Sequence, residues 1–187
     1  AVTGGRYQET DNAYVQAARV AISTSVTGRI VKIHVGENQR VKAGDVLFTL
    51  DKANPQADLA QNEAALASAK ARVSGLQAEY RGKLLGVSAA QERLQYAQSE
   101  LTRTRELGAE GIASKQQVES AEHAVQQAHA DLSAARQAAS AALASLGGDP
   151  SVSVDDHPAV TEAAARLERA RLALSYTEVI APESGTV

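Results

Sequence analysis

The pattern of apolar and polar positions changes character twice along the chain. Over residues 13–51, β-branched residues come in short bursts separated by glycines, which is typical of strands and tight turns. Over residues 52–175 the apolar residues recur at helical spacing, and over residues 176–187 the β-type pattern returns. The pattern predicts an α+β protein dominated by helix, in which a helical segment is inserted between two β-rich stretches.

A seven-residue repeat marks the first helical arm, over about residues 55–107. Asn54 is its candidate N-cap, and Pro55 stands at the first helical position. Small residues occur three positions after most of the bulky ones, which predicts a closely packed helical pair. The bulky positions are Leu59, Leu66, Val73, Tyr80, Val87, Leu94 and Leu101. The pattern is interrupted by Gly75, Gly82 and Gly86, where we expect a bend or the close approach of another element.

A second arm follows over about residues 114–175, with Ser114 as its candidate N-cap. The connection over residues 108–113 is short, so the two arms are predicted to form an antiparallel hairpin with its tip there. Glycine and proline interrupt the returning arm over residues 147–158, which predicts a loop and a fresh helix start near Pro158. The bulky positions of this arm are Val118, Val125, Leu132, Leu146, Val160, Leu167 and Leu174.

Composition narrows the possible functions. Aromatic residues make up 3% of the 187 residues although hydrophobic residues make up 44%, so a thick globular core and an enzyme built around one are not expected. The formal net charge of -3 argues against nucleic acid or an anionic membrane surface as the main partner. The absence of cysteine excludes disulfides, thiolate metal sites and cysteine nucleophiles.

Residues 1–12 are polar and contain glycine, which predicts a leader or linker. The chain lacks an initiator methionine and any apolar run of about 20 residues that would span a bilayer. We therefore expect a processed or trimmed piece from which a signal or membrane anchor has been removed.

Short motifs in the two β-type stretches resemble the halves of a biotinyl/lipoyl-like domain. The second half begins at Ala181-Pro182 and stops early at Val187, and the first half is carried by Gly28-Arg29-Ile30, Val35-Gly36, Val41, Gly44, Leu47 and Leu50-Asp51-Lys52. Lipoyl-like halves split by a coiled-coil hairpin are the hallmark of periplasmic adaptors, or membrane fusion proteins, of the HlyD/EmrA type. Within this family, the segments Glu9–Val15 and Leu146–Val160 resemble the EmrA-like multidrug efflux subgroup.

This resemblance implies the adaptor subunit of a tripartite multidrug efflux system. The implied partners are an outer-membrane channel of the TolC type, an inner-membrane transporter of the major-facilitator type, and further copies of the chain in a ring or sheath. It implies a periplasmic location with an anchor in the inner membrane upstream of Ala1, and it implies neither an enzyme activity nor a cofactor or metal.

The resemblance also assigns a partner-binding motif to the hairpin tip. Arg103, Leu107 and Ser114 match the spacing of the family's tip motif, which engages the outer-membrane channel. Taken without the resemblance, Arg103 is a solvated charge, Leu107 closes the seam between the arms and Ser114 is an N-cap. Ser114 can serve as both cap and contact.

Three alternatives remain open. The same architecture would suit the adaptor of a type I protein secretion system. A lipoyl or biotinyl carrier would use Lys52, but this lysine precedes the predicted helix instead of occupying a turn between two strands, and no methionine flanks it. A plain structural coiled coil does not explain the two β stretches.

The histidines at positions 123 and 129 are six residues apart, which is not the spacing of a metal pair on a helix.

Overall fold

The computed structural model describes residues 20–187. Residues 1–19 lie outside the described part of the chain. The predicted leader over residues 1–12 and the Glu9–Val15 segment of the family resemblance both fall there.

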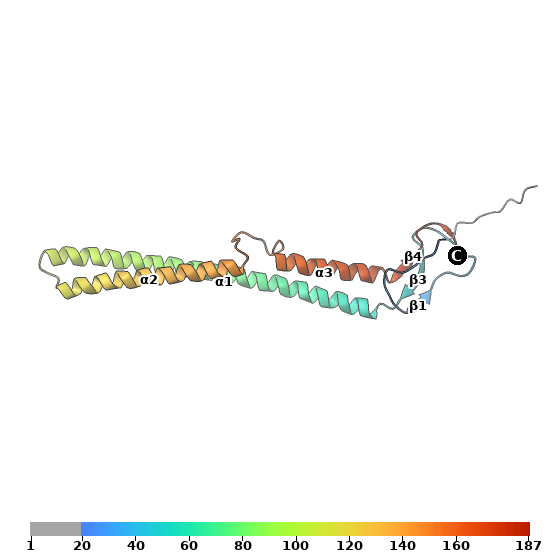
Figure 1. Cartoon of the computed structure of the whole chain (residues 1–187), viewed down its shortest axis with the longest axis horizontal. Helices are drawn as coiled ribbons and strands as arrows, with labels where there is room; N and C mark the ends of the chain where they lie inside the picture. Colours follow the sequence, from blue (N-terminus) through green and yellow to red (C-terminus); the bar gives the residue numbers. More distant parts are fainter. Residues whose placement is uncertain (1–19) are drawn as a thin grey trace, which may run out of the picture. The chain divides into compact units, whose positions relative to one another are not determined.

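The described residues form two compact units, which we describe separately. One unit combines the residues up to Asp51 with residues 176–187, and the other is Lys52–Ser175. The first contains five short strands and the second contains three helices, which Figure 1 shows in sequence colours. The predicted fold class is confirmed, because a long helical hairpin is inserted between two β-rich stretches.

Antiparallel pairing joins the two β stretches into one unit. The strands are β1 (Ile30–Ile33), β2 (Arg40–Val41), β3 (Val46–Leu50), β4 (Glu178–Ile180) and β5 (Gly185–Thr186). One sheet has the order β1-β3-β4, and a second sheet pairs β2 with β5. Phe48 of β3 is opposite Ile33 on one side and Val179 on the other. Strands from both ends of the sequence therefore complete each other's hydrogen bonding.

A small aliphatic core holds this unit together. Val41, Leu47 and Ala181 are buried against one another, and the partly buried Val35 and Phe48 pack around them. The backbone of Ala181 donates to Asp45 O and accepts from Gly44 N, both at 2.8 Å. Branched aliphatic residues and one phenylalanine suffice for a core of this size. This explains why aromatic residues are scarce in the two β-rich stretches.

The first helix starts earlier than the sequence predicts. Helix α1 (Ala53–Ala109) has Lys52 as its N-cap residue, so the prediction of Asn54 as the cap is wrong. The first intrahelical bond runs from Gln56 N to Lys52 O at 2.9 Å. Pro55 fits inside the first turn because the N–H groups of that turn have no intrahelical acceptor to lose.

Three glycines inside α1, Gly75, Gly82 and Gly86, neither end the helix nor lie against a neighbouring element. Helix α1 continues for 57 residues through all three of them. A Cβ atom built at Gly75, Gly82 or Gly86 would meet nothing within 4 Å. The prediction that another element approaches closely at these three glycines is therefore wrong for the described residues.

Replacing Gly75 by alanine is expected to stabilise the hairpin. The site is open and helical, so Gly75→Ala should raise the free energy of unfolding by about 0.5–1 kcal/mol. Gly111→Ala is the matched control, because Gly111 also has open space but adopts φ 73°, which strains an L-residue. Chemical denaturation followed by circular dichroism should show opposite signs for the two variants, and a destabilising Gly75→Ala would contradict the prediction.

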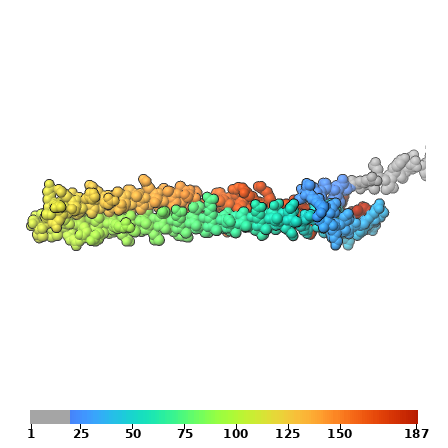
Figure 2. Space-filling model, turned by 90° about the horizontal axis from the view of Figure 1, so that it is seen from below, coloured from blue at the N-terminus to red at the C-terminus, as the bar shows by residue number. Residues whose placement is uncertain are grey.

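Two further helices pack in succession along α1. Helix α2 (Lys115–Ser145) and helix α3 (Pro158–Ser175) both contact α1 and form the returning arm. Figure 2 shows the hairpin as a narrow rod, in which the returning arm lies along α1. The seam between α1 and α2 is built from Ala90, Leu94, Ala128 and Leu132, with Val87, Ala97, Val125 and Ala135 packed around them. Small residues alternate with leucine there, so the helices approach closely without large rings.

The interruption between α2 and α3 is a packed joint. Leu146, Val73 and Val160 are only 1–2% exposed and form one cluster at this level. Two valines of the loop, Val152 and Val154, pack onto the same cluster. Two polar contacts to α1 support them: Gln77 Nε2 donates to Val152 O at 2.9 Å, and Lys70 Nζ lies 2.8 Å from Asp155 Oδ1. The loop predicted over residues 147–158 therefore adds to the hairpin core.

An aspartate turn begins this loop. The carboxylate of Asp149 accepts bonds from the N–H of Ser151 at 2.8 Å and from its hydroxyl at 2.6 Å. These bonds hold the pKa of Asp149 below its usual value, with the side-chain bond as the larger cause. Glycines 147 and 148 adopt positive φ just before it, which ends α2.

Candidate functional site

The hairpin tip is built by a tight turn at the end of α1. The N–H of Glu110, the C-cap residue, donates to Glu106 O at 3.1 Å. Gly111 follows with φ 73°, a backbone conformation that glycine adopts without steric cost, and its N–H donates to Gly108 O at 3.0 Å. The turn therefore depends on a glycine at position 111.

Leu107 is the backbone anchor of this turn. Its carbonyl oxygen accepts from Ile112 N at 2.9 Å and from Ala113 N at 3.1 Å. Carbonyls in the last turn of a helix lack intrahelical donors, and these two bonds satisfy one of them. The side chain of Leu107 remains partly open to solvent, at 38% exposure. The turn thus presents an apolar side chain at the end of the rod.

Ser114 opens α2 through a reciprocal capping box. Its hydroxyl oxygen accepts from Gln117 N at 3.3 Å, while its own N–H donates to Gln117 Oε1 at 2.7 Å. This confirms the predicted N-cap. Because a glutamine stands three residues after the serine, the sequence carries the full capping-box pattern.

Leu107 and Ser114 share one surface notch, whereas Arg103 is not among its lining residues. The notch has a volume of about 390 Å³. It is lined by Thr104, Leu107, Ala113, Ser114, Gln116, Gln117 and Ser120. Arg103 lies one helical turn before Leu107, is largely exposed, and forms an ion pair with Glu100 on the same helix. Hydroxyl and amide groups around a leucine give the notch both apolar contact and hydrogen-bonding capacity.

Ile112 is a further tip residue, which neither the sequence pattern nor the family resemblance assigns to the site. It stands in the turn between Gly111 and Ala113 and is 69% exposed. The sequence contains one indication of this exposure. A large apolar residue in a turn, flanked by glycine and alanine, has no neighbouring side chain large enough to cover it. An exposed isoleucine at the tip of a rod is the type of residue that a protein partner would bury.

A salt bridge ties the two helices together just below the tip. Arg105 Nη2 of α1 lies 2.7 Å from Glu122 Oε1 of α2. Both side chains are about half exposed, so we expect this pair to contribute at most about 1 kcal/mol to stability. It joins the two helices at the same level of the hairpin.

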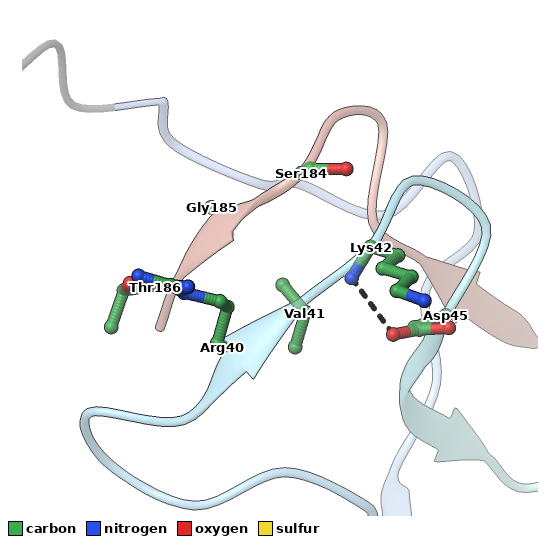
Figure 3. Close-up of a pocket in the computed structure, with 7 residues that line it drawn as sticks. All are labelled: Arg40, Val41, Lys42, Asp45, Ser184, Gly185 and Thr186. Atoms are coloured by element: carbon green, nitrogen blue, oxygen red, sulfur yellow. Dashed lines mark hydrogen bonds between the residues drawn. The ribbon is translucent and has the colours of Figure 1, made fainter.

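The structure gives the lipoyl-carrier alternative no support. Lys52 is the N-cap residue of α1 and comes two residues after the end of β3, so it does not occupy a turn between two strands. A surface depression of about 690 Å³ in the β unit is lined by residues of β2, β5 and the adjoining turns, and Lys52 is not among them. Figure 3 shows its lining, including the hydrogen bond from Lys42 N to Asp45 Oδ2 at 2.8 Å. These residues shape the turn after β2.

Two of the histidines, His34 and His157, make hydrogen bonds that stabilise local structure. His34 Nε2 lies 2.9 Å from Thr49 Oγ1, and His157 Nδ1 accepts from Ala159 N at 3.2 Å at the start of α3. Within residues 20–187, no group of three or more histidine, cysteine or acidic side chains is arranged to hold a metal ion. No helix in the same range is long and apolar enough to cross a membrane.

Comparison with known proteins identifies the family. The sequence profile of the EMRA alpha-helical hairpin domain matches residues 53–177. The multidrug export protein EmrA of Escherichia coli (strain K12) is 32% identical over 181 residues, which cover 97% of this chain and 46% of that protein. The multidrug resistance protein MdtN of Escherichia coli O157:H7 is 37% identical over 186 residues, covering 95% and 53% respectively. The chain thus spans about half the length of these curated relatives.

A solved structure of the periplasmic adaptor protein EmrA aligns with 88% of this chain and 63% of its own, at 15% identity and a TM-score of 0.41. The family assignment rests on the sequence matches, which extend over both the hairpin and the flanking β stretches. The chain belongs to the membrane fusion proteins of the EmrA type, and residues 53–177 are its alpha-helical hairpin domain.

Proposed function

We propose that this chain is the periplasmic portion of an adaptor in a tripartite multidrug efflux system. In this function the adaptor links an inner-membrane drug/proton transporter of the major-facilitator type to an outer-membrane channel of the TolC type. The named functions of the relatives, multidrug export and multidrug resistance, support drug export over protein secretion. The adaptor itself performs no chemical step, and the transporter supplies the energy.

One observation carries the proposed role of the tip. Leu107 and Ser114 line a single notch at the far end of a helical rod, and the exposed Ile112 stands beside it. A partner with helical ends could place a small side chain in the notch and bury Ile112 against its own surface. Arg103 would add a charged hydrogen-bond donor one turn further back, exchanging Glu100 for an acceptor on the channel.

The length of the rod suits a spacer between two membranes. At about 1.5 Å per residue, the 57 residues of α1 extend roughly 85 Å. The seam between α1 and α2 is filled by leucine, valine and alanine, and Tyr80 packs at the joint with α3. The hairpin therefore has a partner surface at its end, while its length sets the distance that the adaptor bridges.

A single introduced cysteine tests the channel contact. The chain has no native cysteine, so Ala109→Cys at the end of α1 provides a unique thiol at the tip. We expect it to crosslink to a co-expressed outer-membrane channel of the TolC type through a short thiol-to-amine reagent. Ala60→Cys is the matched control, an exposed alanine on the same helix roughly 70 Å away. Equal crosslinking from both positions, or none from Ala109→Cys in exporting cells, would contradict the proposal.

A further inference from the structure

The apolar seam of the hairpin is divided into two separate clusters along α1. The joint cluster, which contains Leu146 and Val73, has Tyr80 as its last member on α1. The distal cluster, which is the seam between α1 and α2, begins on α1 with Val87. Residues 81–86 of α1 belong to neither cluster, and we call them the link.

Every residue of the link is exposed. Elsewhere in α1, which the structure describes in full, no more than three consecutive residues are exposed. Lys83 stands at the seam position between Leu76 and Ala90, where an apolar side chain would pack toward α2. On α2, the residues buried between the two clusters are the small Ala139 and Ala142. The link is therefore held mainly by the hydrogen bonds of the helix, and side-chain packing adds little to them.

Two glycines lower the helix stability of the link. Gly82 and Gly86 both lie in it, and a Cβ atom built at either position would meet nothing within 4 Å. Packing therefore does not require glycine there. A glycine in a helix interior lowers the equilibrium constant for helix formation roughly fivefold relative to alanine, because its backbone loses more conformational freedom. Helix α1 is thus weakest where the seam is thinnest.

The returning arm breaks at the level of the link. Arg136 of α2 contacts Gln91 of α1, and in an antiparallel pair a position ten residues further along α2 is close to level with one ten residues earlier on α1. The end of α2 at Leu146 is therefore close to the level of position 81, where the link begins. Gly147 follows with φ 96°. Both arms lose regular support at one height.

The loop between α2 and α3 is tied to the part of α1 that precedes the link. Gln77 Nε2 donates to Val152 O at 2.9 Å, and Lys70 pairs with Asp155 at 2.8 Å. Val154 packs onto the joint cluster as well. These contacts fix the loop on the side of α3 and leave the short stretch between α2 and Val152 as the connection on this arm.

We infer that the link is a hinge about which the hairpin bends. The proximal section, residues 53–80 with the loop and α3, stays together, and the distal section, residues 87–109 with α2, tilts as a unit. Helix α1 bends at Gly82 and Gly86, because glycines are among the positions where helices kink. On the other arm the turn that follows α2 absorbs the displacement, and the contact of Leu146 with the joint cluster loosens.

A hinge at this position changes the direction in which the tip points. The tip at Ala109 is about 25 residues, or roughly 38 Å, beyond the middle of the link, so a tilt of about 15° moves it by roughly 10 Å. This movement lets the tip meet a channel that is not in line with the base of the hairpin. That use rests on the proposed adaptor function, whereas the hinge itself does not depend on it.

Hydrogen exchange of the full chain, followed by mass spectrometry, tests the hinge. We expect amides of residues 82–90 to exchange at least tenfold faster than amides of residues 60–69 and 94–103 in the same helix. The double variant Gly82→Ala, Gly86→Ala should slow this exchange by about 20-fold, since each glycine accounts for roughly fivefold. Ser99→Ala is the matched control, because it raises helix propensity outside the link and should change the exchange of residues 82–90 no more than about twofold.

Spin labels on the returning arm measure the bend itself. The chain has no native cysteine, so labels can be placed at Ala134→Cys on α2 and Ala165→Cys on α3, two exposed positions on either side of the link. Because packed helices lie about 10 Å apart, a tilt of about 15° about α1 should broaden the distance distribution by roughly 3 Å. The control pair Ala124→Cys, Ala144→Cys lies within α2 and should stay narrow. Gly82→Ala, Gly86→Ala should narrow the first distribution to the width of the control.

Three results would overturn the hinge: uniform exchange along α1, exchange of residues 82–90 that the double alanine variant leaves unchanged, or equal widths for the two label pairs. Circular dichroism verifies that each variant is folded. If the hinge fails while Ala109→Cys still crosslinks to the channel, the adaptor function stands. If the crosslink fails while the link exchanges rapidly and the labels show the bend, the hinge stands and the proposed function is wrong.

Discussion

The double variant Arg103→Asp, Ser114→Arg is expected to lose drug export while keeping a folded hairpin. Arginine at position 114 would place a long, positively charged side chain in the notch that Ser114 shares with Leu107. Aspartate at position 103 would stand beside Glu100, the present partner of Arg103, and reverse the charge offered to the channel. Drug resistance of cells carrying the variant should fall to the level of cells without the adaptor.

The folding effect of this variant should be small because only one cap is lost. Removing the serine N-cap costs about 1 kcal/mol, which leaves the long seam between α1 and α2 intact. Ser114→Thr, which keeps a capping hydroxyl, should export normally, and Ser114→Ala separates loss of the cap from added bulk. Arg169→Asp on α3 controls for charge reversal away from the tip. Full export by the double variant would refute the tip assignment.

Truncating Leu146 to alanine is expected to cause the largest loss of stability. Leu146 is 1% exposed and shares its cluster with Val73 and Val160, where α2 ends and the interruption begins. A buried leucine replaced by alanine leaves a cavity, and the expected loss is about 2–5 kcal/mol in the free energy of unfolding. Chemical denaturation followed by circular dichroism at 222 nm (the helix band) measures it.

Leu85→Ala is the control with the same change in chemistry. Its side chain is 72% exposed, so in dilute solution the variant should stay within about 0.5 kcal/mol of the parent chain. A loss below about 1 kcal/mol for Leu146→Ala would mean that the interruption is a loose connection able to collapse around the change. The expected large loss would identify it as a joint that holds α2 and α3 on α1.

The seam and the tip turn follow closely from local sequence rules. The seven-residue repeat needs only helical geometry to place Leu94 and Leu132 in one interface, and the structure confirms this pair in one cluster. Ser114 followed three residues later by Gln117 is a complete capping signal, and both bonds of the box are present. These features depend on neighbours within one or two turns, so sequence spacing contains the information.

Sequence spacing failed where the outcome depends on which residues pack against each other or where the first helical turn begins. Gly75 and its companion glycines were expected to mark close approach, but nothing lies opposite them among the described residues. The α1 start was misplaced because proline is tolerated throughout a first turn, so Pro55 does not mark the first helical residue, and the actual N-cap, Lys52, makes no side-chain capping bond that a sequence rule could detect. The involvement of Val152 and Val154 in the hairpin core was not predicted, since a loop has no periodicity that shows which side chains turn inward.

By itself, the sequence determined the β-helix-β order, the antiparallel hairpin, the position of its tip and the resemblance to membrane fusion proteins, because each of these depends on spacing along the chain. Only the tertiary structure decided that Leu107 and Ser114 share a notch that Arg103 does not line, that Ile112 is exposed at the tip, and that Arg136 of α2 lies beside Gln91 of α1. Those relations join residues on different helices. They are set by packing and by the register of α1 against α2, which no local pattern contains.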